Sequence, residues 1–160
     1  MNKVLVLGVG NLLLSDDGVG IHAIRRLQDE TQLPTNVEVM DGGTLGLSLL
    51  RHLEGVSRLL VVDAVEMDRP AGALIRLAGD QVPAYMALKM SPHEIGLPDL
   101  LFAAKLRDLY PQEVVIWGIQ PAKVAAGLEL SEPVVGQLDA LVREIETELG
   151  RWSEVPAQPG

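Results

Sequence analysis

A chain of 160 residues in which 48% of the side chains are hydrophobic can bury one full core, and we expect a single domain. The formal net charge of -9 argues against nucleic acid and anionic membranes as partners, and the lack of cysteine excludes disulfides, thiolate metal sites and cysteine nucleophiles. With no signal-peptide pattern and no stretch that could span a bilayer, we expect a soluble cytoplasmic protein.

The chain begins with an aliphatic strand, Lys3–Val9, that runs into a loop rich in glycine and carboxylates. The loop occupies residues 8–20, and a helix is predicted from Gly18 to Glu30. Its glycines permit a sharp turn where a side chain would clash. The adjacent Asp16 and Asp17 then lie at a helix N-terminus just beyond the carboxyl end of a strand, where open α/β sheets bind ligands.

Two simpler interpretations of this loop compete with a catalytic one. A dinucleotide site needs a third glycine where the chain has Leu13, and two carboxylates would repel a pyrophosphate, so nucleotide binding is disfavoured. An aspartate at a helix start also accepts backbone N–H groups and suits the helix dipole. Capping explains one aspartate and not its neighbour, so we assign capping to Asp16 and keep Asp17 as the candidate for chemistry.

The next two strands also end beside carboxylates. The strand Val37–Met40 runs into Asp41-Gly42-Gly43-Thr44, followed by a predicted helix at Leu45–Glu54, and the strand Arg58–Val62 stops at Asp63. A lone aspartate after a strand is most simply a turn residue. Three strands in succession that end this way favour a functional site at the carboxyl edge of a parallel sheet.

The elements after Asp63 complete the predicted sheet. The fourth strand follows the third too soon for a crossover helix, so it should run antiparallel to it. In chain order we predict a strand at Ala73–Leu77, irregular chain over Ala78–Pro92, a helix at Pro98–Leu109, a strand at Val114–Ile119 and a helix at Val134–Leu149. We expect an α/β three-layer sandwich: a mostly parallel five-stranded sheet with one antiparallel strand and helices on both faces. Residues 1–150 form the domain, and residues 151–160 are expected to be a disordered tail.

Two of the carboxylates are predicted to converge. If the strand order starts 2-1-3, the loops after the first and third strands are neighbours, which brings Asp17 to Asp63. Carboxylates that close repel one another unless a proton or a cation lies between them. His93, on a loop, could add a nitrogen ligand, and such an oxygen, oxygen, nitrogen set suits zinc or nickel. The opposing hypothesis is a small acidic hydrolase that uses paired carboxylates without a metal.

Five short segments in a fixed order make a specific combination that spans nearly the whole chain. They are Gly8-Val9-Gly10-Asn11 with Asp16-Asp17-Gly18-Val19-Gly20, then Asp41-Gly42-Gly43-Thr44, Val61-Val62-Asp63-Ala64, Ser91-Pro92-His93-Glu94-Ile95-Gly96-Leu97, and Gly118-Ile119-Gln120-Pro121. This combination resembles the nickel–iron hydrogenase maturation proteases. The family fold, an α/β sandwich with a mostly parallel sheet, agrees with the one predicted above.

The resemblance implies an endopeptidase that removes a C-terminal extension from the precursor of the hydrogenase large subunit after nickel insertion. It implies that Asp17, Asp63 and His93 contact the metal and that Asp41 lies near the site. The catalytic group is not identified, and these four residues are the candidates. The implied supporting loops contain Gly8, Gly10, Asn11, Asp16, Gly42, Gly43 and Thr44.

The implied metal is nickel, contacted in the precursor, and zinc or cadmium could replace it in a crystal. The implied partner is the large-subunit precursor, and we expect a monomer with no nucleic-acid or membrane partner. The chain has no His-Glu-x-x-His or Gly-x-Ser-x-Gly pattern of the common protease classes. Two alternatives stay open: a metal-dependent hydrolase of small molecules on the same scaffold, and a non-catalytic nickel-binding chaperone.

Overall fold

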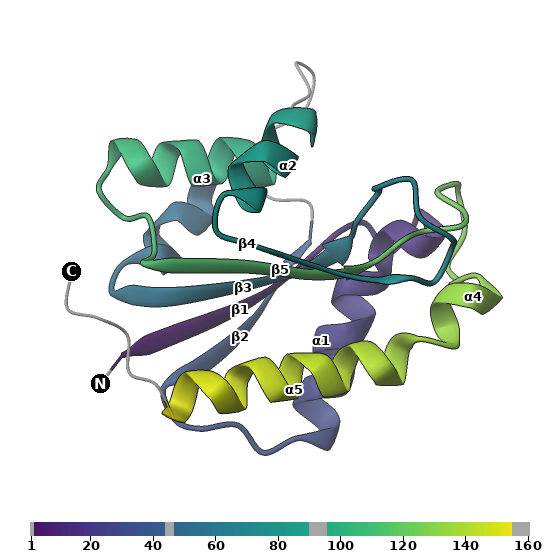
Figure 1. Ribbon diagram of the computed structural model, residues 1–160, viewed down its shortest axis with the longest axis horizontal. Helices are drawn as coiled ribbons and strands as arrows, with labels where there is room; N and C mark the ends of the chain where they lie inside the picture. The colour runs from purple at the N-terminus through teal and green to yellow at the C-terminus, as the bar shows by residue number, and fades with distance from the viewer. Residues whose placement is uncertain (1, 44–46, 90–95, 155–160) are drawn as a thin grey trace.

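A twisted five-stranded sheet runs through the centre of the protein in the computed structural model, which describes residues 2–43, 47–89 and 96–154 (Figure 1). The strands are β1 (Lys3–Val9), β2 (Val37–Gly43), β3 (Val56–Ala64), β4 (Leu74–Ala78) and β5 (Glu113–Ile119). Their order is β2-β1-β3-β5-β4, which confirms the predicted 2-1-3 start. The first three strands and β5 are parallel, and β4 runs antiparallel to β5 and therefore also against β3, as predicted.

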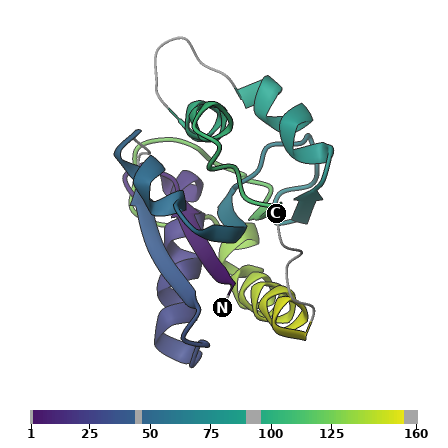
Figure 2. The same cartoon turned by 90° about the vertical axis from the view of Figure 1, so that its left-hand side faces the viewer.

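Helices cover both faces of this sheet. They are α1 (Val19–Glu30), α2 (Gln81–Lys89), α3 (Leu97–Leu106), α4 (Glu132–Val135) and α5 (Leu138–Glu154), with 3-10 helices η1 (Ser15–Gly18) and η2 (Leu47–Leu53). In Figures 1 and 2, α2 and α3 lie on one side of the sheet and α1 and α5 on the other. The predicted three-layer α/β sandwich is confirmed. No helix in the described part of the chain is both long and apolar enough to cross a membrane.

The strand side chains alternate between two buried clusters, one under each helix layer. Leu5 and Leu7 pack toward α2, α3 and η2, whereas Val4 and Val6 pack toward α1 and α5. Each such aliphatic side chain contributes about 1.5–3 kcal/mol when fully buried. Because both faces of the central strands are covered, their sequences are continuously aliphatic, and this explains why they could be predicted from the sequence.

Two segments on the α2/α3 side differ from the prediction. The segment Ala78–Pro92, predicted as irregular, contains the helix α2, whose Val82, Tyr85 and Met86 are buried in the core. The predicted helix Leu45–Glu54 is instead the 3-10 helix η2, which buries Leu53. In both cases packing against the sheet and α3 decides the backbone, because short segments have little helical stability of their own.

The C-terminal helix also differs in its bounds. The single helix predicted at Val134–Leu149 is divided into α4 and α5, and α5 continues to Glu154. The predicted start of a disordered tail at residue 151 is therefore wrong for residues 151–154, while residues 155–160 lie outside the described part. Trp152 explains the extension, because its side chain is buried and its carbonyl accepts a hydrogen bond from the Arg58 guanidinium at 2.7 Å.

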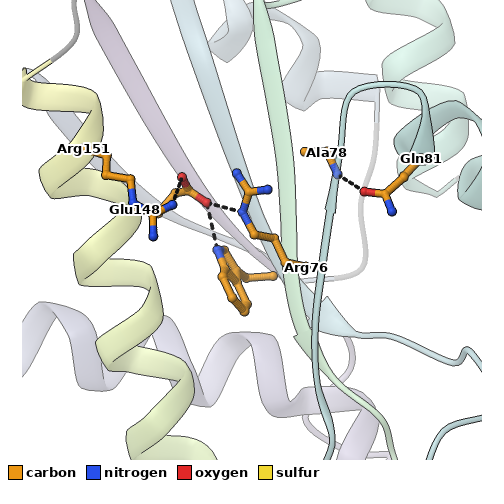
Figure 3. Close-up of polar contacts among 6 residues, drawn as sticks. Arg76, Ala78, Gln81, Glu148 and Arg151 are labelled. Atoms are coloured by element: carbon orange, nitrogen blue, oxygen red, sulfur yellow. Dashed lines mark hydrogen bonds and ion pairs between the residues drawn. The ribbon is translucent and has the colours of Figure 1, made fainter.

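A buried carboxylate ties α5 to the edge of the sheet (Figure 3). Glu148 accepts hydrogen bonds from Arg76 Nε of β4 at 2.6 Å and Trp117 Nε1 of β5 at 3.1 Å, and Arg151 lies 3.8 Å from its other oxygen. Burial raises the pKa of Glu148, but these hydrogen bonds and the arginine charges together lower it by more, so the net shift is downward. Glu148 is therefore an ionised link between α5 and two strands.

Candidate functional site

Close backbone packing brings the loop after β1 against the end of β3. Gly10 has a φ of 133°, and a Cβ there would lie 1.9 Å from the carbonyl oxygen of Asp17. A Cβ on Gly20 would lie 2.1 Å from the carbonyl oxygen of Val62. Glycine is required at both positions because the opposing atoms are backbone. Gly10 lets the loop fold back on η1, and Gly20 lets the start of α1 pack directly against β3.

The carboxylate of Asp17 is held inside this loop. Its Oδ2 accepts the backbone N–H of Asn11 at 2.9 Å, and the side-chain oxygen of Asn11 in turn accepts the N–H of Leu13 at 2.9 Å. Asp17 is half-buried. The loop thus fixes one oxygen of Asp17 and positions the carboxylate at the carboxyl edge of β1.

Asp63 stands at the end of β3 as a buried carboxylate with two different partners. Its Oδ1 accepts the N–H of Ala64 at 2.8 Å, and its Oδ2 accepts a hydrogen bond from Lys89 Nζ at 2.9 Å. Burial raises the pKa of Asp63 from 3.8 to about 6; the charge of Asp17 also raises it, while Lys89 opposes the shift.

Lys89, the last residue of α2, is a site residue that the sequence reasoning missed. Its ammonium lies 5.4 Å from the centre of the Tyr85 ring as well as on Asp63. Burial lowers the pKa of Lys89, but the charge of Asp63, its hydrogen bond and the nearby Tyr85 hydroxyl together raise it more, so the net pKa lies above its usual value. The i, i+4 spacing of Tyr85 and Lys89 was the available signal, but it is informative only in a helix, and this segment was predicted to be irregular.

Asp16 does not cap the helix, contrary to the prediction. It is fully buried, and its carboxylate accepts the N–H groups of Ala122 and Lys123, each at 2.9 Å, and both the N–H and the hydroxyl of Ser131, at 2.7 and 2.8 Å. Burial raises its pKa, but these hydrogen bonds lower it more, so the net shift is downward. Asp16 therefore anchors the loop after β5 to the loop after β1.

Asp41 lies at the same edge of the sheet but not beside Asp63. It belongs to β2, which is separated from β3 by β1, a distance of about 10 Å for two strand spacings. Its Oδ1 accepts the N–H of Gly43 at 2.8 Å, and its Oδ2 lies 3.7 Å from Arg25 on α1. Asp41 therefore shapes the turn after β2, where Gly43 takes a φ of 50°.

Some of the other predicted site residues lie in the described part of the chain and others do not. Gly8 is packed against the start of α1, because a Cβ there would lie 2.9 Å from the carbonyl oxygen of Gly20, and Gly42 lies within β2. His93 and Thr44 fall outside the described residues. Within the described ranges, no three His, Asp or Glu side chains are grouped so as to hold a metal ion. The role of His93 as a third metal contact stays a prediction.

Comparisons with known proteins agree with this architecture. The profile of the hydrogenase maturation protease family matches residues 21–148. The hydrogenase expression/formation protein HupD of Rhodobacter capsulatus is 40% identical over 152 residues, which cover 94% of this chain and 72% of HupD. The hydrogenase 2 maturation protease of Escherichia coli K12 is 33% identical over 158 residues, covering 98% and 96% of the two chains.

A solved structure extends the likeness to the fold. The hydrogenase maturating endopeptidase HybD from Escherichia coli superposes with a TM-score of 0.87 at 31% identity, and the match covers 93% of each chain. Sequence and fold are therefore similar along nearly the same length. The chain belongs to the hydrogenase maturation proteases, a family of hydrolytic enzymes.

Proposed function

We propose that this protein is the endopeptidase that removes the C-terminal extension from the precursor of a nickel–iron hydrogenase large subunit. Membership of the maturation protease family supports the reaction class. The observation that carries the proposal is the buried Asp63 carboxylate near the end of β3, against which the loop that holds Asp17 and the start of α1 is packed. Two carboxylates at one sheet edge give the protein a place to receive a positive charge.

In this proposal the nickel ion arrives as part of the substrate. Asp17 and Asp63 contribute carboxylate oxygens, and His93 contributes an imidazole nitrogen, a donor set that suits nickel. The ammonium of Lys89 on Asp63 supports the fit, because it is a positive charge held at this carboxylate in the free protein. Since the single charge of Lys89 offsets only part of the repulsion between the two carboxylates, a divalent cation is favoured there, and so is a precursor that already carries its metal.

The two alternative functions make different demands. A hydrolase of small molecules needs a pocket beside the reacting groups. The pocket described between α2 and α3, about 220 Å³ in volume, is lined largely by apolar side chains, including Val82, Met86 and Phe102, and Asp17 and Asp63 are not among its lining residues. A non-catalytic nickel-binding chaperone would bind the precursor and leave its length unchanged.

Incubation with nickel-loaded and nickel-free precursor, followed by intact mass measurement, separates these functions. We expect the loaded precursor to lose one C-terminal peptide and the nickel-free precursor to stay whole. The variant Asp29→Asn, which changes an exposed aspartate of α1, is the matched control and should cleave like the wild type. A stable complex with uncleaved, loaded precursor would instead identify a chaperone, and cleavage of both forms would remove nickel from the recognition step.

A further inference from the structure

Lys89 occupies one particular oxygen of Asp63. Oδ1 of this carboxylate accepts the backbone N–H of Ala64 at 2.8 Å, so movement of a partner side chain cannot release it. Oδ2 is held only by the Lys89 ammonium, at 2.9 Å, among the described residues. The oxygen that can become available to an incoming cation is therefore the one that the lysine covers.

Of the two partners, the lysine is the one that can leave. The Asp63 side chain is 6% exposed and stands on a central strand, whereas the Lys89 side chain is 33% exposed and ends α2. A lysine carries a point charge on a flexible four-carbon stem. Its ammonium can withdraw into solvent while the buried Val82, Tyr85 and Met86 keep α2 in place. The contact with the Tyr85 ring, at 5.4 Å, sets where the ammonium rests.

Charge balance favours an exchange of this kind. Asp17, Asp63 and Lys89 together carry one net negative charge when all three are ionised. If a divalent cation replaces the ammonium, the two carboxylates and the cation sum to zero. A cation on a buried carboxylate is also weakly screened by solvent, so its charge counts more there than at an exposed site.

We propose that Lys89 is a displaceable internal cation, which covers Oδ2 of Asp63 in the free protein and leaves it when a divalent metal ion binds. The inference rests on the proposed function in that the natural metal ion is the one carried by the precursor. A free ion must displace the ammonium by itself, whereas a precursor also gains contacts elsewhere on the protein. Lys89 thus makes the site respond to metal-loaded precursor rather than to free metal ions.

The exchange can be observed directly in the full chain. The ammonium groups of ¹⁵N-labelled lysines are recorded by NMR, and the Lys89 signal is assigned by its loss in Lys89→Met. In metal-free protein, we expect this signal to be protected from exchange with water. On addition of Cd²⁺, a diamagnetic probe for the metal, it should move to the position of exposed lysines. If Cd²⁺ shifts the Asp63 carboxyl signal while the Lys89 ammonium stays in place, the proposal is wrong.

The affinity for free Cd²⁺ gives a second measurement, by calorimetry at pH 8. Lys89→Met should bind Cd²⁺ at least about tenfold more tightly than the wild type, a typical size for the coupling between two competing ligands. The matched control is Lys105→Met on α3, because Lys105 is exposed and also lies over a tyrosine ring, 5.0 Å from the centre of Tyr110. It should bind Cd²⁺ like the wild type.

A third variant keeps the test informative if Lys89→Met does not fold, as circular dichroism would show. Lys89→Arg retains the positive charge and can donate two hydrogen bonds to a carboxylate, so it should bind Cd²⁺ no more tightly than the wild type. Tighter binding by this variant, or equal or weaker binding by folded Lys89→Met, would overturn the proposal. So would the absence of Cd²⁺ binding in every protein. Binding by Lys89→Met alone would support it.

These outcomes are distinct from failure of the proposed function. If the proposed function is wrong, the wild type will not cleave nickel-loaded precursor, whatever Cd²⁺ does to Lys89. If only the Lys89 inference is wrong, Lys89→Met will bind Cd²⁺ with unchanged affinity while the wild type cleaves the precursor normally.

Discussion

The carboxylate of Asp16 accepts both the backbone N–H and the hydroxyl of Ser131, at 2.7 and 2.8 Å, although the two residues are 115 positions apart in the chain. Two further N–H groups, of Ala122 and Lys123, donate to the same carboxylate. Four donors on one fully buried carboxylate join the loop after β1 to the loop after β5. The backbone that presents Asp17 is thus fixed by its sequence neighbour.

The variant Asp16→Asn should destabilise the fold. The amide loses the charge and turns an NH₂ donor toward groups that are themselves donors, so we expect a loss of about 2–3 kcal/mol in the free energy of unfolding. Urea denaturation of the variant and the wild type measures this difference, with the exposed Asp29→Asn as the control that should change little. A helix cap would tolerate Asn, so an unchanged stability would contradict the anchoring role.

A pair of glycine variants tests the close approach of α1 to β3. A Cβ on Gly20 would lie 2.1 Å from the carbonyl oxygen of Val62 and 2.5 Å from that of Val9, so Gly20→Ala should cost about 3 kcal/mol or more. Gly150 lies in α5, and a Cβ there meets no atom within 4 Å. Gly150→Ala should be neutral or add up to ~1 kcal/mol through helix propensity. Thermal unfolding of both variants checks the contrast.

The Glu148 network predicts a third difference in stability. Glu148→Gln removes the charge that Arg76 and Trp117 contact and should cost about 1.5–3 kcal/mol. The control is Gln81→Ala, which removes a 3.1 Å hydrogen bond to the exposed N–H of Ala78 and should cost less than about 1 kcal/mol (Figure 3). If both variants lose the same free energy of unfolding in denaturant titrations, the buried Glu148 contacts stabilise the fold no more than an exposed hydrogen bond does.

The titration of Asp63 provides a pH prediction. Its pKa is raised from 3.8 to about 6 in the folded protein, chiefly by burial. The folded state therefore holds this proton more tightly than the unfolded chain, so the stability that Asp63 contributes is full below pH 3.8 and is lost as pH rises through about 6. A ¹³C NMR titration of the Asp63 carboxyl should show a midpoint near 6.

The same titration in Lys89→Met should show a midpoint higher than in the wild type, because Lys89 lowers the pKa of Asp63. The direction of this change is the critical result. A downward shift, or no shift, would mean that the ammonium does not act on the carboxylate in solution.

The last prediction concerns processing of nickel-loaded precursor. His93→Ala should abolish cleavage, since alanine offers no metal ligand, and Asp63→Asn should impair it, since the amide lacks the charge that attracts a cation. Intact mass measures the cleavage, and circular dichroism confirms that each variant is folded. Full cleavage by folded His93→Ala would remove His93 from the metal contact.

The sequence by itself determined the sheet and the edge of it at which the candidate carboxylates lie. Continuous aliphatic runs such as Leu59–Val62 mark strands that are buried on both faces, and the short link before β4 requires that strand to be antiparallel. Asp17 and Asp63 could be placed at adjacent strand ends for the same reason. These features follow from local backbone geometry and burial, which leave a periodic pattern in the sequence.

Only the tertiary structure decided which groups contact the carboxylates of Asp63 and Asp16. Lys89 reaches Asp63 across 26 residues and Ser131 reaches Asp16 across 115, and neither contact leaves a periodic signal. The helix α2 was missed because its stability comes from burying Val82 and Tyr85 against the sheet. Side-chain partners distant in sequence depend on how the chain returns to the sheet edge, and that path is set by the packing of the whole domain.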